Sequence, residues 1–130
     1  MKKYWLILAA CLSILHAGSI LDDDAFKHVY ADPQNSDKKV LMLYSATTCP
    51  QCAYMKDKVF KDKDVEAYMK KHFVVLLKDI NTDDLPSGFD YFGIPTMFII
   101  DQDGTMMKKI IGSSRAKPFL EKLHDVIEAK

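Results

Sequence analysis

The sequence predicts one α/β domain built on a central mixed β-sheet flanked by helices. Two apolar runs, 40–45 and 73–77, are separated by helix-like periodicity, which is typical of a right-handed βαβ unit. An Asp-Gly turn at 101–104 joins two further strand-like segments, which predicts a β-hairpin. The expected order is helix, β, α, β, α, β, β, α.

The first 17 residues are predicted to be a secretory signal peptide. A basic start at 1–3 precedes an uncharged apolar stretch at 4–15, and Ala17 offers a small residue for cleavage. The stretch is too short and wrongly flanked to be a spanning helix. We therefore expect export to the periplasm and a mature domain over 18–130.

A lipoprotein signal is the alternative for this leader. Leu8-Ala9-Ala10-Cys11 resembles a bacterial lipobox, in which Cys11 becomes the lipidated first residue and anchors the protein. That reading leaves a very short apolar core before Cys11 and an apolar mature start at 12–15. Cleavage after Ala17 is therefore preferred.

The expected mature domain is nearly neutral. Loss of Lys2 and Lys3 leaves 16 Lys and Arg against 18 Asp and Glu, a net charge of −2. This balance favours neither nucleic acid nor an anionic membrane as a partner. The length suits one ordinary domain with one core, and we expect a monomer.

The elements before the first turn follow from caps and periodicity. Acidic capping residues precede the apolar positions of a short helix over 22–30, which should end near Pro33. The apolar run 40–45 predicts a strand. A helix should begin directly after Cys49, because proline is tolerated in a first helical turn.

The middle of the chain predicts a second helix and a strand. Asp62 or Asp64 should cap the helix, which is either continuous with the preceding one or kinked near Phe60. The run 73–77 is apolar at every position, as expected of a central parallel strand covered on both faces.

The last third predicts a loop with a short helix over 81–91, strands over 96–101 and 105–111, and an amphipathic helix around 119–127. No repeat, low-complexity tract or second domain is recognisable in the sequence. The chain therefore folds around one sheet.

The motif Cys49-Pro50-Gln51-Cys52 follows a predicted strand and opens a predicted helix. Helix N-termini favour a thiolate over a thiol, so Cys49 should be the attacking nucleophile. Cys52 lies one turn further on and can resolve a mixed disulfide by intramolecular attack. Cys11 lies in the leader, so the mature chain has only this pair.

Metal binding is the alternative use of this pair. Zinc would need two further ligands, and His28, His72 and His124 are scattered over different elements. A copper-handling protein would use methionines, but most of these fall at core-facing positions. We therefore expect no metal site, and no cofactor beyond the redox-active disulfide Cys49–Cys52.

Lys39 to Glu128 resembles the thioredoxin superfamily, because the Cys49–Cys52 motif and Gly93-Ile94-Pro95-Thr96 occur in the family's order and separation. The chain is most similar to the exported bacterial branch, which includes the carboxy-terminal domain of DsbD and SoxW-type thioredoxins. The resemblance implies a thioredoxin fold. It also implies a cis proline at Pro95 that faces the disulfide, and a substrate groove formed by Thr48, Ile94, Pro95 and Thr96.

Two positions depart from the family pattern. Thr48 replaces the usual tryptophan before the first cysteine, which reduces the apolar surface beside the disulfide. Leu43 replaces a buried acid that the family often uses to relay the proton of the second cysteine; Lys78 or Asp79 could substitute, or could be solvated strand-end charges. Tyr44, Tyr54, Tyr91 and Phe92 could line the groove or belong to the core.

The resemblance implies a thiol–disulfide oxidoreductase that acts on exported proteins containing disulfides. A membrane thiol donor of the DsbD type would recharge the pair. Pro50 and Gln51 occupy the positions that tune the potential, and Gln51 adds no positive charge, which favours a reductase of moderate potential. A disulfide oxidant or isomerase, and a non-catalytic or copper-binding thioredoxin-like module, remain the alternatives.

Overall fold

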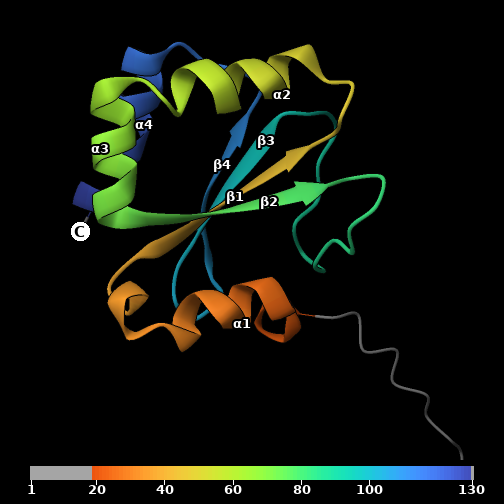
Figure 1. Ribbon diagram of the computed structural model, residues 1–130. Helices are drawn as coiled ribbons and strands as arrows, with labels where there is room; N and C mark the ends of the chain where they lie inside the picture. The colour runs from red at the N-terminus through yellow and green to blue at the C-terminus, as the bar shows by residue number, and fades with distance from the viewer. Residues whose placement is uncertain (1–18, 130) are drawn as a thin grey trace, which may run out of the picture.

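The computed structural model describes residues 19–129 as a four-stranded sheet with helices on both faces (Figure 1). This confirms the predicted α/β class. The helices and strands are α1 (Asp24–Ala31), β1 (Lys39–Ser45), α2 (Pro50–Tyr54), η3 (Met55–Val59), α3 (Lys63–His72), β2 (Phe73–Asp79), β3 (Thr96–Ile100), β4 (Met106–Ile111) and α4 (Ala116–Glu128), with short 3-10 turns η1 (Ile20–Asp22) and η2 (Pro33–Asn35).

The sheet is mixed, with the strand order β2-β1-β3-β4. β1 pairs in parallel with β2, in a register that places Leu41 beside Val75 and Leu43 beside Leu77. β1 pairs antiparallel with β3, and β3 pairs antiparallel with β4. The predicted βαβ unit and hairpin are both present.

Two apolar layers cover the two faces of the sheet. Because side chains alternate along a strand, Leu41 and Leu43 point to the layer of α3, α4 and η3, whereas Met42 and Tyr44 point to the layer of α1. Figure 1 shows α1 alone on its side of the sheet and the other helices together on the opposite side. Every residue from Val40 to Tyr44 is fully buried.

The helical segment after the CxxC motif is interrupted, and this settles the choice left open by the sequence. η3 is a π-helical turn that follows α2, and the Phe60 N–H donates to the Met55 carbonyl at 2.8 Å. α3 then starts afresh with Asp62 as its cap, because the Asp62 carboxylate accepts the N–H groups of Asp64 and Val65.

Two sequence predictions are wrong. β2 is an edge strand, not a central one, and Val75 and Leu77 are 37% and 55% exposed. The apolar run predicts a strand, but it does not predict which strands lie beside it in the sheet. The expected short helix over 81–91 is absent, since this segment forms turns and loop. Within residues 19–129, no helix is long and apolar enough to cross a membrane.

Candidate active site

The CxxC motif lies where β1 ends and α2 begins. Cys49 is the N-cap of α2, with extended backbone angles, and Pro50 occupies the first helical turn. The Cys49 N–H donates to the Ala46 carbonyl, which closes the turn between strand and helix. The short connection therefore fixes the first cysteine at a helix N-terminus, as the spacing predicted.

The two cysteines are joined in a disulfide, with their Cα atoms 5.2 Å apart. Cys52 is fully buried, whereas Cys49 is only partly buried. The Cys52 N–H donates to the Cys49 sulfur at 3.1 Å. In the dithiol form a backbone N–H in this position stabilises negative charge on sulfur, so the site favours a thiolate at Cys49.

The loop before β3 carries the second predicted motif. The Ile94–Pro95 peptide bond is cis. Ile94 is half-buried, whereas Pro95 and Thr96 are buried. The Thr96 hydroxyl donates to the Gly93 carbonyl at 2.7 Å, so the Thr96 side chain holds the loop together.

A turn between β4 and α4 connects this loop to the CxxC motif. The Gly112 N–H donates to the Pro95 carbonyl at 2.8 Å, and the Ser113 hydroxyl donates to Gln51 Oε1 at 2.7 Å. The Ser114 N–H contacts the Met55 sulfur at 3.4 Å. Both predicted motifs are therefore held by the same turn.

Sequence reasoning missed this turn. Sequence patterns assigned no role to Gly112 or to the two serines that follow it. The available signal was the Gly-Ser-Ser sequence after a hairpin strand, because Gly112 has a φ of +82° that favours glycine. The partner of Ser113 is 62 positions away, which no local pattern reveals.

Leu43 occupies the position where the family often has a buried acid. It is fully buried in the apolar layer of α3 and α4. Lys78 is not a solvated strand-end charge: its ammonium lies 2.5 Å from the Asp23 carboxylate, and both side chains are about nine-tenths buried. Asp79 accepts the Asn81 N–H at the end of β2.

The four aromatic residues that were candidates to line the substrate groove are divided between the core and the surface. Tyr44 is fully buried and packs edge-on against Tyr91 and Phe98, with ring centroids 5.3 and 4.9 Å apart. Burial, helped by the negative charge of Asp23, raises the pKa of Tyr44. Tyr54 and Phe92 are exposed, and Phe92 completely so, with the Lys109 ammonium 5.9 Å from its ring centroid.

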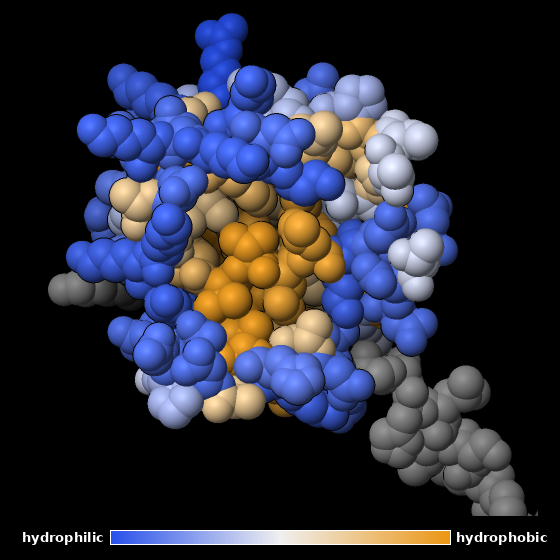
Figure 2. All heavy atoms as spheres, viewed as in Figure 1, coloured by the Kyte–Doolittle hydropathy of each residue, from blue (hydrophilic) through white to orange (hydrophobic). Residues whose placement is uncertain are grey.

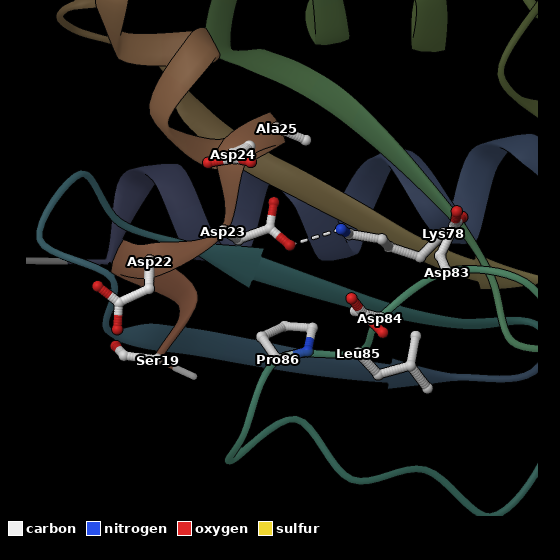
Figure 3. Close-up of a pocket in the computed structure, with 10 residues that line it drawn as sticks. All are labelled: Ser19, Asp22, Asp23, Asp24, Ala25, Lys78, Asp83, Asp84, Leu85 and Pro86. Carbon is white, nitrogen blue, oxygen red and sulfur yellow. Dashed lines mark hydrogen bonds and ion pairs between the residues drawn. The ribbon is translucent and has the colours of Figure 1, made fainter. Parts of the chain in front are cut away.

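A separate acidic pocket of about 560 Å³ lies beside the start of α1 (Figure 3). Asp23, the N-cap of α1, and Lys78 from β2 point toward one another, while Asp83 and Asp84 come from the loop after β2. In the part of the chain described, no three His, Cys, Asp or Glu side chains are grouped to hold a metal ion. The pocket is lined by Ser19, Asp22, Asp23, Asp24, Ala25, Lys78, Asp83, Asp84, Leu85 and Pro86.

A CxxC disulfide at a helix start in this fold defines a thioredoxin-like oxidoreductase fold. The sequence profile of the thioredoxin-like domain matches residues 26–127. The chain therefore belongs to the thioredoxin-like domain family. No curated protein sequence matches it.

Several solved structures are similar to this chain. A putative disulphide-isomerase from Bacteroides thetaiotaomicron is 25% identical, with a TM-score of 0.63 over 82% of this chain and 87% of that chain. The oxidised DsbD c-terminal domain from Neisseria meningitidis is 23% identical, with a TM-score of 0.60 over 78% and 92%. The periplasmic thioredoxin SoxS from Paracoccus pantotrophus is 15% identical, with a TM-score of 0.58 over 70% and 97%.

Proposed function

We propose that this chain is an exported thiol–disulfide oxidoreductase that reduces disulfides in other exported proteins. The observation that carries this proposal is the asymmetry of the pair. Cys49 is only partly buried and its sulfur accepts the Cys52 N–H, whereas Cys52 is fully buried. Cys49 therefore attacks and Cys52 resolves.

In the proposed cycle, the Cys49 thiolate attacks one sulfur of a substrate disulfide. A mixed disulfide forms, and the other substrate sulfur leaves as a thiolate. Cys52 loses its proton and attacks the Cys49 sulfur, which releases the second substrate thiolate and closes the Cys49–Cys52 disulfide. The substrate gains two electrons and two protons, and no further cofactor takes part.

A thiol donor in the membrane, of the DsbD type, returns the pair to the dithiol. The likeness to the DsbD c-terminal domain and to SoxS supports thiol–disulfide partners of this kind. Thr48 and the loop 94–96 are the proposed substrate-binding residues; Thr96 is fully buried and contributes by holding the loop through its bond to the Gly93 carbonyl. Pro50 and Gln51 set the potential.

Export rests on residues 1–17, which lie outside the described residues. We propose that they are removed and that the mature protein spans 18–130, in the periplasm. Intact-mass measurement of protein expressed from the full gene tests this. A mature chain beginning at or near Gly18 supports it, and an acylated Cys11 establishes the lipoprotein alternative.

The roles of the two cysteines are tested by Cys49→Ser and Cys52→Ser. The first variant should lose disulfide exchange, and the second should accumulate mixed disulfides with substrates, which non-reducing gels detect. Equal trapping by both variants would contradict the assigned roles. Insulin reduction with dithiothreitol separates the enzyme from a non-catalytic or copper-binding module.

The direction of electron flow separates a reductase from an oxidant or isomerase that runs the same residues in reverse. Thioredoxin has a potential of about −270 mV and DsbA about −120 mV, a difference of about 7 kcal/mol. Stabilising a dithiol that far takes several favourable charges, and the motif supplies a helix terminus and Gln51. We expect a potential nearer to thioredoxin; a pair that stays dithiol in oxidising glutathione mixtures would indicate an oxidant.

A further inference from the structure

The free edge of β2 is an apolar surface that the proposed redox function does not use. Val75 and Leu77 are exposed on it, beside a groove of about 570 Å³ lined in part by Phe60 and Met69. Figure 1 shows β2 at the front of the sheet, and Figure 2 shows a continuous hydrophobic patch in the same place. Among residues 19–129, no strand pairs with this edge.

The backbone of β2 offers hydrogen bonds along this edge. The Ile80 N–H donates to the Ser45 carbonyl of β1, so alternation directs the backbone groups of Leu76 toward β1 as well. The backbone groups of Val75 and Leu77 therefore point away from the sheet. The next outward N–H, that of Asp79, already donates to the Asp83 carboxylate at 2.6 Å.

Proteins usually protect an edge strand with a proline, a bulge or a central charge. β2 has neither proline nor a register irregularity in its pairing with β1, and its lysine, Lys78, turns inward to Asp23. The centre of the edge is thus apolar and open. It is suited to pairing with another strand.

Charge complementarity identifies the occupant. Lys70 and Lys71 are exposed shortly before β2, with Lys70 paired to Glu66 at 2.9 Å, and Asp83 and Asp84 are exposed shortly after the strand. One end of the edge is therefore basic and the other acidic. An antiparallel strand with the same sequence places each basic end beside the acidic end of its partner, whereas a parallel copy would place like charges together.

We propose that a second copy of this chain pairs with β2, antiparallel and across a two-fold axis at Leu76. In this register Val75 of each copy lies opposite Leu77 of the other, and these two residues exchange N–H···O=C bonds. The sheet then continues through both copies, and the two apolar grooves meet. This replaces the expectation of a monomer.

Leu77→Lys tests the surface. Sedimentation equilibrium of protein expressed from the full gene should show a dimer. The variant should raise the dissociation constant of the dimer roughly 100-fold, because the interface loses one leucine side chain from each copy. Met107→Lys on β4, at the opposite edge, is the matched control, since Met107 is also exposed. Thermal unfolding verifies that both variants fold. A wild-type protein that stays monomeric at high concentration, or an equal effect of Met107→Lys, would overturn the proposal.

Leu76→Cys tests the register, in a background with both site cysteines replaced by serine. Leu76 faces its own copy in a pair whose Cα atoms are about 4.5 Å apart, so mild oxidation should crosslink the dimer. Val74→Cys is the control, because each Val74 lies about four residues from its copy and beyond disulfide reach. Crosslinking of Val74→Cys but not of Leu76→Cys would overturn the register. Added salt should weaken the wild-type dimer, because the paired ends carry opposite charges.

Discussion

The Asp23 carboxylate has two roles at the start of α1. It caps the helix by accepting the Phe26 N–H at 3.1 Å, and it pairs with the Lys78 ammonium from β2 at 2.5 Å. Burial raises the pKa of Asp23, but the hydrogen bonds from Lys78 and Phe26 outweigh it and hold the pKa below its ordinary value. One side chain thus joins α1 to the sheet.

Asp23→Asn should destabilise the protein by about 3 kcal/mol. Asparagine keeps the cap, but it leaves the buried Lys78 ammonium without a counter-charge. Asp24→Asn is the control, because Asp24 is 92% exposed and lies 3.6 Å from Lys27, so stability should stay near wild type. Urea unfolding measures both. A double variant, Asp23→Asn with Lys78→Met, should recover much of the loss.

The same pair predicts a pH dependence. The folded-state pKa of Asp23 is lowered, so its contribution to stability is fully present above the ordinary value of 3.8. The contribution is lost as the pH falls through the lower folded-state pKa. Unfolding free energies measured against pH should therefore show wild type and Asp23→Asn converging at acid pH. A constant difference would contradict the assigned ionisation.

At the scale of elements, the hairpin turn between β3 and β4 packs closely against the turn η1. Gly104 has a φ of +85°, and an added Cβ would lie 2.9 Å from Ile20 Cγ2 and 3.0 Å from Leu21 Cδ2. Ile20 itself is buried. The glycine is thus required both by the turn and by the close approach of η1.

Gly104→Ala should cost about 2 kcal/mol or more, because the backbone angle and the contact with Ile20 both penalise a Cβ. Gly112→Ala separates the two causes. Gly112 has a similar φ of +82° but open space around its Cβ position, so its cost should be about 1 kcal/mol. Equal losses in thermal or urea unfolding would show that the contact with η1 contributes nothing.

Local sequence patterns predicted most of the helices and strands, but not which of them lie side by side in the fold. The strand 40–45, the helix start after Cys49 and the Asp-Gly hairpin depend on nearby residues, and each is present. The edge position of β2 depends on strands elsewhere in the chain. The partner of Lys78 is 55 positions away and that of Ser113 is 62 away, so neither could be inferred from sequence spacing.

At the scale of the whole molecule, the sheet separates two cores. The helix α2, which starts at the Cys49–Cys52 disulfide, lies on the side of α3 and α4, whereas α1 covers the other side (Figure 1). The redox state of the pair is thermodynamically linked to the stability of the whole domain. In a strong oxidant the folded dithiol form is stabilised relative to the folded disulfide form.

For the proposed reductase, the oxidised protein should unfold at a higher temperature than the protein in dithiothreitol. A variant with serine at both Cys49 and Cys52 should show no response to dithiothreitol. Calorimetry in both conditions makes the comparison. Greater stability of the dithiol would favour an oxidant.

The unequal burial of Cys49 and Cys52 also determines how the protein will behave in thiol-labelling experiments. Cys52 is fully buried, so an alkylating reagent should modify the folded dithiol once, at Cys49, and mass spectrometry should detect a single adduct. A second adduct should form only after unfolding. Labelling under native conditions would therefore count half of the reduced cysteines, and samples must be denatured in acid before the reagent is added.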